Sequence, residues 1–353
     1  MTRHYLLVGS TKGLFIYQSN DRSDWVLSGP HLKGWEIFSA FMRADGRILV
    51  GTSHFVYGPC IRYSDDFGAS WDFADTAPKY PKSRGYEVKR IWQLQEHQGK
   101  LYAGVDSAGL FESSDQGNTW REVEALSQHP TREQWFPGQG GLCLHTIIPD
   151  HSDSQNMWVG ISAAGVFRSR DSGQSWQVQN HGLPEIPTKH MPSEVGRCVH
   201  KMVQDPLEPQ RLYMQYHGTV YTSYDAGDSW QEWSEGLPCR FGFPMSISSQ
   251  GEVFVIPLES DEYRMVPDGR LRVYKRQAQD PMWREASTGL PQRGQHIGVL
   301  RDSLCCDDEA LAGVYFGTSS GSVYASKDAG RHWRQLEGNV PRVTCVSTRA
   351  IHS

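Results

Sequence analysis

The chain has 353 residues, enough to bury a sizeable hydrophobic core in one large domain or in two to three ordinary ones. A formal net charge of −5, without any run of like charges, excludes the basic surface that a nucleic-acid backbone requires. No apolar segment reaches membrane-spanning length, and the N-terminus lacks the features of a signal peptide. We therefore expect a soluble cytoplasmic protein that binds neither nucleic acid nor membrane. The 35 glycines and 12 tryptophans favour an all-β protein with many tight turns.

A short string recurs along the chain with the pattern Ser-x-Asp-x-Gly-x-(Ser/Thr)-Trp. Its copies are SDDFGASW at 64, SSDQGNTW at 113, SRDSGQSW at 169, SYDAGDSW at 223 and SKDAGRHW at 326, where His332 replaces the hydroxyl residue. Two degenerate copies, GLFIYQSNDRSDW and LRVYKRQAQDPMW, end at Trp25 and Trp283. The seven tryptophans are then 46, 49, 56, 54, 53 and 50 residues apart, a period that indicates a repeat architecture.

The same predicted strands follow one another in each repeat. An apolar run such as LCLHTII comes first, then a strand such as NMWVGI, a strand such as GVFRSR, the recurring string, and a short strand after the tryptophan. Four short antiparallel strands in about 50 residues are typical of one blade of a β-propeller.

The two ends of the chain complete this pattern. The first repeat begins with its second strand, HYLLVG, and so lacks an inner strand, whereas no blade follows the C-terminal run PRVTCVSTRA. We expect residues 342–350 to lie innermost in the first blade. That pairing would close a single seven-bladed domain spanning residues 1–353 and remove its exposed sheet edges.

The recurring string itself is predicted to be a hairpin turn with a structural role. Its aspartate can accept hydrogen bonds from backbone amides, its glycine can adopt positive φ, and its hydroxyl residue can tie the loop back. The tryptophan then buries a large ring between neighbouring sheets. A catalytic acid is not needed in five copies, so we interpret these aspartates as structural.

This pattern resembles the Asp-box, or BNR, repeat of the sialidase-like propeller superfamily, and the resemblance covers nearly the whole chain. It implies a β-propeller fold. The superfamily spans sialidases, xyloglucanases, sorting receptors and photosystem II assembly factors, so the resemblance does not name one activity. The seven-blade count agrees best with the assembly-factor type, although nothing in the sequence is specific to photosynthesis.

A ligand is expected on the face where the inter-blade connections emerge. The longest of these, 121–141 and 177–196, are predicted to lie there, and the segment EQWFPGQGG, with Trp135, Phe136 and Gln139, is predicted to reach over the channel mouth. Inner-strand alignment makes Trp92, His145 and His200 equivalent in three consecutive blades. The predicted ligand-binding residues are His54, Arg90, Trp92, His145, Arg197, His200, His217 and Glu259.

Metal and thiol chemistry are weighed separately. The three histidines His145, His200 and His217 could hold a metal with a carboxylate, but their long-range spacing and the lack of HExxH or HxH favour no metal, and we expect no cofactor. Seven cysteines without a CxxC pair predict neither a disulfide framework nor a zinc knuckle. Cys305 and Cys306 lie beside acidic residues, which would raise a thiol pKa and lower its reactivity.

Whether the chain is an enzyme stays open. A sialidase-like site would use Arg90, Arg197 and Arg301 to clamp a carboxylate, but the FRIP-type motif is missing and sialidase propellers have six blades. A xyloglucanase-like site would use mouth carboxylates such as Asp106 and Glu259, although xyloglucanases build their cleft from two propellers. We expect a site for an anionic small molecule, a glycan or a protein partner, with a glycoside hydrolase as the alternative.

Overall fold

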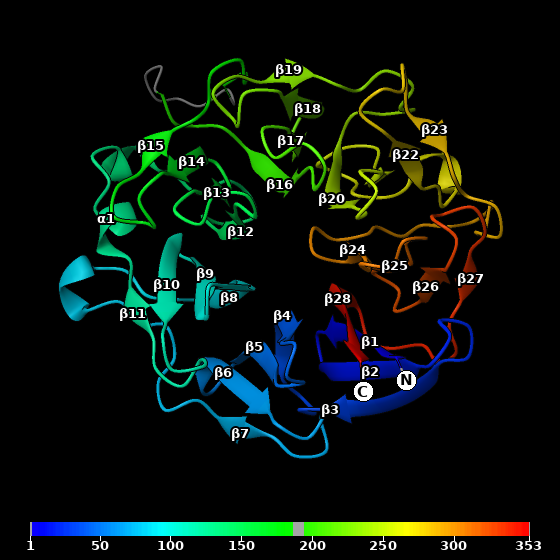
Figure 1. Ribbon diagram of the computed structural model, residues 1–353, viewed down its shortest axis with the longest axis horizontal. Helices are drawn as coiled ribbons and strands as arrows, with labels where there is room; N and C mark the ends of the chain where they lie inside the picture. The colour runs from blue at the N-terminus through cyan, green and yellow to red at the C-terminus, as the bar shows by residue number, and fades with distance from the viewer. Residues whose placement is uncertain (1, 186–193, 353) are drawn as a thin grey trace.

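The computed structural model describes residues 2–185 and 194–352, and it consists almost entirely of β-strands. Seven four-stranded antiparallel sheets stand around a central channel, and the chain runs round the ring from blade to blade (Figure 1). This arrangement confirms the predicted seven-bladed β-propeller. Among the described residues, no helix has the length and apolar character needed to span a membrane.

The first four blades follow the chain from its N-terminus. From the inner to the outer strand, blade one contains β28 (Val343–His352), β1 (Thr2–Ser10), β2 (Gly13–Ser19) and β3 (Val26–His31). In the same order, blade two contains β4 (Glu36–Met42), β5 (Ile48–His54), β6 (Gly58–Ser64) and β7 (Asp72–Phe73). Blade three contains β8 (Arg90–His97), β9 (Lys100–Asp106), β10 (Gly109–Ser113) and β11 (Arg121–Glu122). Blade four contains β12 (Leu144–Pro149), β13 (Met157–Ile161), β14 (Gly165–Ser169) and β15 (Gln177–Val178).

The remaining three blades repeat the same order. Blade five contains β16 (Val199–Gln204), β17 (Leu212–Tyr216), β18 (Val220–Ser223) and β19 (Gln231–Glu232). Blade six contains β20 (Gly242–Ile247), β21 (Val253–Pro257), β22 (Tyr274–Arg276) and β23 (Arg284–Glu285). Blade seven contains β24 (Leu304–Cys306), β25 (Val314–Gly317), β26 (Val323–Ser326) and β27 (Arg334–Gln335). The described helical segments are short: α1 (Glu124–Ser127), η1 (Lys82–Arg84), η2 (Arg132–Gln134) and η3 (Pro267–Gly269).

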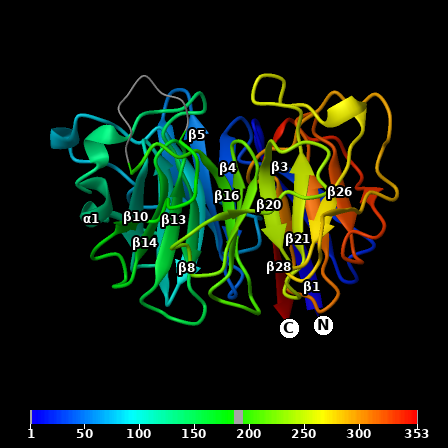
Figure 2. The same ribbon diagram turned by 90° about the horizontal axis from the view of Figure 1, so that it is seen from above.

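The C-terminal strand closes the ring as predicted. β28 pairs with β1 in antiparallel register from Thr2 opposite His352 to Ser10 opposite Val343. The two termini therefore lie side by side at one end of the channel (Figure 2). All inner strands run in the same direction, and β28 runs toward the end of the channel that holds the termini. The other inner strands therefore begin at the opposite end of the channel; they are β4, β8, β12, β16, β20 and β24. The mouth at that opposite end is the face on which the sequence predicts a ligand site.

The recurring string forms the hairpin turn that its residues predict. In blade four the Asp171 carboxylate accepts hydrogen bonds from the Ser169 hydroxyl (2.8 Å) and from the backbone amide (2.8 Å) and hydroxyl (2.6 Å) of Ser175. Gly173 adopts φ of 89°, and its amide donates to the Ser169 hydroxyl. In the copy that ends at Trp333, the His332 ring replaces the hydroxyl, with Nδ1 2.7 Å from Asp328 Oδ2. We call these segments the box turns.

The tryptophans after the box turns join neighbouring blades. The indole nitrogens of Trp230, Trp283 and Trp333 donate to backbone carbonyls of the preceding blade, at Gln179, Trp233 and Ala286. All three rings are buried. The degenerate copy that ends at Trp283 therefore makes the same hydrogen bond as the copies that end at Trp230 and Trp333. The indole nitrogens of Trp71, Trp120 and Trp176 donate to carbonyls within their own turns instead.

The adjacent pair Cys305 and Cys306 has raised thiol pKa values, and the sequence indicates only part of the cause. Burial, more than the neighbouring acidic residues, raises the pKa of both thiols, that of Cys306 to about 12. A thiol that stays protonated at neutral pH is a poor nucleophile. The seven cysteines are all free.

Candidate functional site

One backbone irregularity recurs where the inner strands meet the channel mouth. In six blades the pairing of the inner strand with its neighbour skips one or two inner-strand residues, which is the mark of a β-bulge. A bulge breaks the alternation of the strand and re-aims a side chain. The skipped residues are Phe38, Trp92, His145, His200, Phe243 with Pro244, and Thr344.

The bulged side chains surround a cavity of about 340 Å³ at this mouth. Five of the skipped residues lie on its wall, and every blade contributes at least one lining residue. The wall is formed by Phe38, Trp92, Gly138, Gln139, Gly140, Gly141, Ser162, Cys198, His200, His217, Phe241, Phe243, Asp261, Arg264, Leu300, Arg301, Asp302 and Thr344. The recurring bulge thus turns a side chain of the inner strand toward the cavity in five of the seven blades.

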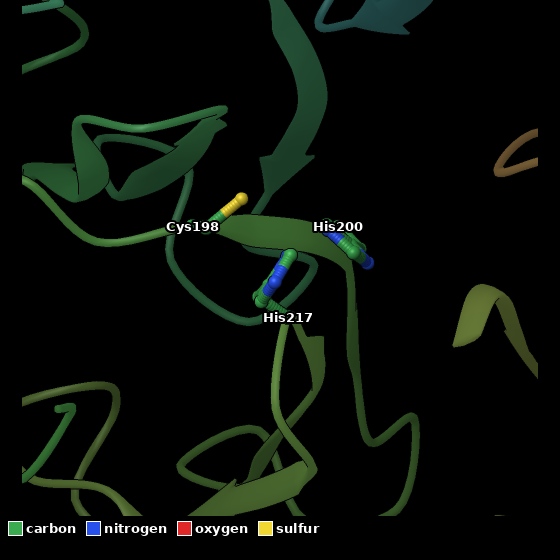
Figure 3. Close-up of side chains that lie close together, drawn as sticks. All are labelled: Cys198, His200 and His217. Atoms are coloured by element: carbon green, nitrogen blue, oxygen red, sulfur yellow. The ribbon is translucent and has the colours of Figure 1, made fainter. Parts of the chain in front are cut away.

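Two histidines and a cysteine from blade five, His200, His217 and Cys198, lie close together (Figure 3). All three line the cavity. The His200 ring lies 5.4 Å from that of His217 and stacks on Phe243 at 4.6 Å between centroids. His200 Nδ1 is 2.6 Å from the carbonyl oxygen of Gly242, so this nitrogen carries the proton and Nε2 keeps its lone pair. Burial and the nearby Arg301 lower the pKa of His200 well below its usual value, and the ring is neutral at pH 7.

Two arginines provide positive charge on the cavity wall, and both lie near Phe243, on which His200 stacks. The Arg301 guanidinium carbon lies 5.6 Å from the centroid of the Trp92 ring and 5.9 Å from that of Phe243. Arg264 lies 5.4 Å from the Phe243 centroid, and its Nε donates to the Asp261 carbonyl. Among residues 2–185 and 194–352, no carboxylate oxygen lies within 4 Å of either guanidinium, and Arg301 Nε is buried without an acceptor.

The acidic groups near the cavity differ in their surroundings. Asp261 is partly exposed and lies 3.6 Å from Nε2 of His217, whereas Asp302 accepts a 2.6 Å hydrogen bond from Lys201 across the channel. Asp106 is buried behind Gly141, 3.6 Å from Arg90. Burial raises the pKa of Asp106, and this outweighs the opposing effects of Lys89 and Arg90.

The structure brings together only part of the predicted site. Trp92, His200 and His217, together with Gln139 and Arg301, lie on the cavity wall. His145 occupies an equivalent bulge but is fully buried, with Nε2 2.9 Å from the Val199 carbonyl and Nδ1 3.0 Å from the Thr146 hydroxyl. One nitrogen is bonded to the next blade and the other to a neighbour on its own strand, so His145 is placed behind the wall.

The other predicted residues lie outside the cavity wall. His54 belongs to a separate aromatic cluster with Trp35 and Tyr57, and Glu259 is exposed outside the wall. Arg90 lies at the edge, over Phe38, and pairs with Asp106. Arg197 donates to the carbonyls of Leu183 and Val195 and to Glu185. The three arginines of a sialidase-like clamp therefore do not converge.

Only part of the loop EQWFPGQGG, which the sequence predicts to reach over the channel mouth, lines the cavity. Gly138 to Gly141 line the cavity, but the Trp135 ring is buried against Phe167, and its indole nitrogen donates to Thr131. The sequence predicts that Trp135 lies at the channel mouth. Instead its ring packs into the hydrophobic core shared by blades three and four. Of the connection 177–196, residues 186–193 lie outside the described residues.

Sequence reasoning misses several wall residues. Phe38 and Phe243 occupy the bulge positions of blades two and six, and extending the inner-strand alignment to those blades would find them. Asp261 and Arg264 follow Glu259 by two and five residues, in a connection whose path the sequence pattern does not fix. Cys198 lies two residues before His200, just before the same inner strand.

Comparisons with known proteins agree with this architecture. No family model matches the chain. A xyloglucanase from Paenibacillus sp is 22% identical over 250 residues, which cover 61% of this chain and 23% of that protein. An ancestral GH74 enzyme superposes with a TM-score of 0.59 at 15% identity over 89% of this chain and 38% of that one. The structure of YCF48 bound to D1 peptide superposes with a TM-score of 0.57 at 12% identity, covering 90% and 93% of the two chains.

These similarities support the fold but do not assign an activity to this chain. The chain is a seven-bladed propeller with distant sequence similarity to xyloglucanases, and it spans about a quarter of the length of the Paenibacillus relative, 23%. The structural neighbours share the fold at identities of 15% and 12%. The site itself must therefore carry the functional argument.

Proposed function

We propose that the cavity at the channel mouth binds a small anionic molecule. The observation that carries this proposal is Arg301, whose guanidinium lies on the cavity wall with a buried, unbonded Nε and no carboxylate within 4 Å among the described residues. An anion in the cavity would give this guanidinium a charged hydrogen-bond partner, and such a bond contributes about 1.5–3 kcal/mol. Arg264 adds a second positive charge on the same wall.

The rest of the wall supports an anion that carries an apolar or sugar-like body. Trp92, Phe38, Phe241 and Phe243 offer ring faces, and the neutral His200 adds a nitrogen acceptor. A cavity of about 340 Å³ is within the size range of small-molecule sites. The box turns support the further inference that the chain belongs to the Asp-box superfamily of sialidase-like propellers, which hosts several unrelated activities.

A thermal-shift screen followed by calorimetric titration tests this proposal. Simple carboxylates, phosphates, sulfates and sugar acids would be compared on the wild-type protein, on Arg301→Gln and on Arg331→Gln. Arg331 is exposed on a box turn at the other end of the channel, so it matches the charge change without touching the cavity. Loss of one charged hydrogen bond, about 1.5–3 kcal/mol, lowers affinity by about 10- to 150-fold in Arg301→Gln only. Equal losses in both variants would reject the site.

A second candidate function is hydrolysis of a glycoside, favoured by the similarity to the Paenibacillus xyloglucanase. Asp261 and Asp302 line the cavity, and Asp106 is a buried acid with a raised pKa behind Gly141. A glycosidase needs one carboxyl group that stays protonated and one that stays ionised. Release of reducing ends from xyloglucan oligosaccharides, abolished in both Asp106→Asn and Asp261→Asn, would favour the hydrolase. Ligand binding without turnover would favour the binding protein.

A further inference from the structure

The cysteine and two histidines on the cavity wall form a compact set of metal-ligating atoms. One ligand atom from each of Cys198, His200 and His217 lies within 4.8 Å of the other two (Figure 3). Cys198 lies just before β16, His200 is the bulged residue of β16, and His217 follows β17. We propose that these three side chains bind a Zn²⁺ ion.

The surroundings of the two histidines fit this role. A histidine that binds a metal almost always donates its other ring N–H to a carbonyl or carboxylate, which fixes the ring and its tautomer. His200 makes this contact with the Gly242 carbonyl at 2.6 Å, which leaves Nε2 as the ligand atom. His217 has the Asp261 carboxylate 3.6 Å from Nε2. Asp261 either orients this ring from behind or supplies an oxygen as the fourth ligand.

The ligand types select the metal. Thiolate sulfur and imidazole nitrogen are the donors that zinc prefers, in a tetrahedral arrangement with bonds of about 2.3 Å and 2.0–2.1 Å. Such bonds separate the ligand atoms by about 3.3–3.7 Å, so the three side chains need to move inward by about 1 Å. His217 is partly exposed, with 37% of its side chain accessible, and has room to rotate.

Negative groups near these three side chains can balance the two positive charges of a Zn²⁺ ion. Cys198 can bind zinc only as a thiolate, so its thiol gives up a proton when the metal binds. On binding, the S–H bond breaks, the proton leaves to solvent, and the sulfur lone pair forms the bond to zinc. The resulting thiolate and the Asp261 carboxylate offset the two charges of the ion, which counters repulsion from Arg264 and Arg301 on the same wall.

The sequence does not indicate this site, because the histidines considered there are His145, His200 and His217 and their long-range spacing favours no metal. In the structure both nitrogens of His145 are hydrogen-bonded. Cys198 takes its place. Three protein ligands would leave a zinc coordination position open toward the cavity, the arrangement found in catalytic rather than structural zinc sites. The proposal does not depend on the anion-binding function.

Metal titration of the full-length protein tests the proposal. After treatment with a chelator under reducing conditions, the protein would be titrated with Zn²⁺ in competition with a chromophoric chelator, and separately with Co²⁺. We expect one Zn²⁺ per chain and, with Co²⁺, a thiolate-to-cobalt charge-transfer absorption in the near ultraviolet. Cys198→Ala and His217→Gln should lower zinc affinity by about 100-fold or more and remove this absorption, and Asp261→Asn should lower affinity by about 10- to 100-fold.

Matched controls separate this site from other thiols and imidazoles. Cys60→Ala and His97→Gln change a cysteine and a histidine that do not line the cavity, and both should retain wild-type affinity. Arg301→Gln should bind zinc at least as tightly as the wild type, because it removes a positive charge from the same wall, and this distinguishes the zinc site from the anion site. Melting temperatures of all variants would report whether each is folded. Absence of stoichiometric zinc in the wild type, or unchanged affinity and absorption in folded Cys198→Ala, would overturn the proposal.

Discussion

Replacing the aspartate of one box turn measures how much that turn stabilises its blade. In Asp171→Ala the carboxylate loses three hydrogen bonds, one from Ser169 and two from Ser175. At about 0.5–1.5 kcal/mol each, the loss is about 1.5–4.5 kcal/mol, and we take the lower part, about 2 kcal/mol, because Ser175 is exposed and water can replace its bonds. An unfolding entropy of about 2.1 cal/mol/K per residue over 353 residues converts this to a fall in Tm of about 3 °C.

Differential scanning calorimetry would measure this change beside a matched surface variant. Glu235→Ala removes a carboxylate from an exposed residue of the neighbouring blade and should change stability by less than about 0.5 kcal/mol. Asp171→Asn, which retains one carbonyl oxygen as acceptor, should fall between the two. If Asp171→Ala melts at the same temperature as Glu235→Ala, the hydrogen bonds of the Asp171 carboxylate do not stabilise the fold.

Three further predictions concern the pH response, the packing between blades and the closure of the ring. Burial holds the pKa of His145 and His200 well below the usual value, so only the unfolded chain gains their protons below about pH 6.5. The free energy of unfolding should therefore fall on acidification, by up to about 1.4 kcal/mol per pH unit for each histidine, and His145→Gln should show a shallower fall in urea denaturation between about pH 7.5 and 5.5. A Cβ on Gly104 would lie 2.5 Å from the Leu144 carbonyl oxygen of the next blade, whereas one on Gly218 meets open space. Gly104→Ala should cost about 1–3 kcal/mol more than Gly218→Ala in the same assay. Deleting residues 343–352 removes β28 and exposes the edge of β1, so the truncated chain should lose soluble yield and its cooperative melting transition.

The architecture could be predicted because its signals are local and repeated. The box turn needs a glycine at positive φ and an aspartate that accepts bonds from backbone amides. These requirements explain why the same residue types recur in the five recognisable copies. The tryptophan after the turn joins neighbouring blades, so the number of copies equals the number of blades. Closure by β28 followed from the missing inner strand of blade one.

The site was less predictable because a side chain's direction depends on the bulge and not on the strand pattern alone. Trp92, His145 and His200 were correctly aligned, and all three prove to be bulged residues. Yet His200 lines the cavity while His145 lies behind the wall, although each ring is hydrogen-bonded to a backbone carbonyl of the next blade. In His145 the second ring nitrogen is also in contact with the Thr146 hydroxyl. Such contacts join residues distant in sequence, and a repeat pattern does not encode them.

The role of the connecting loops could not be derived from length or composition. Trp135 lies in a long aromatic segment but packs into the core, whereas Gly138 to Gly141, which begin three residues further on, line the cavity. His54 and His217 occupy equivalent ends of second strands, yet only His217 lies on the wall. In each case the path of the loop decides the outcome.

Crystallography with an anion of strong anomalous scattering tests most directly whether the channel mouth is a binding site. Crystals of the wild-type protein and of Arg301→Gln would be soaked in selenate, a tetrahedral dianion. We predict an anomalous selenium peak within hydrogen-bonding distance of Arg301 in the wild type, and no peak at that position in Arg301→Gln. Selenate bound only at surface lysines and arginines, with the cavity beside Trp92 and Phe243 free of anion, would contradict the proposed function.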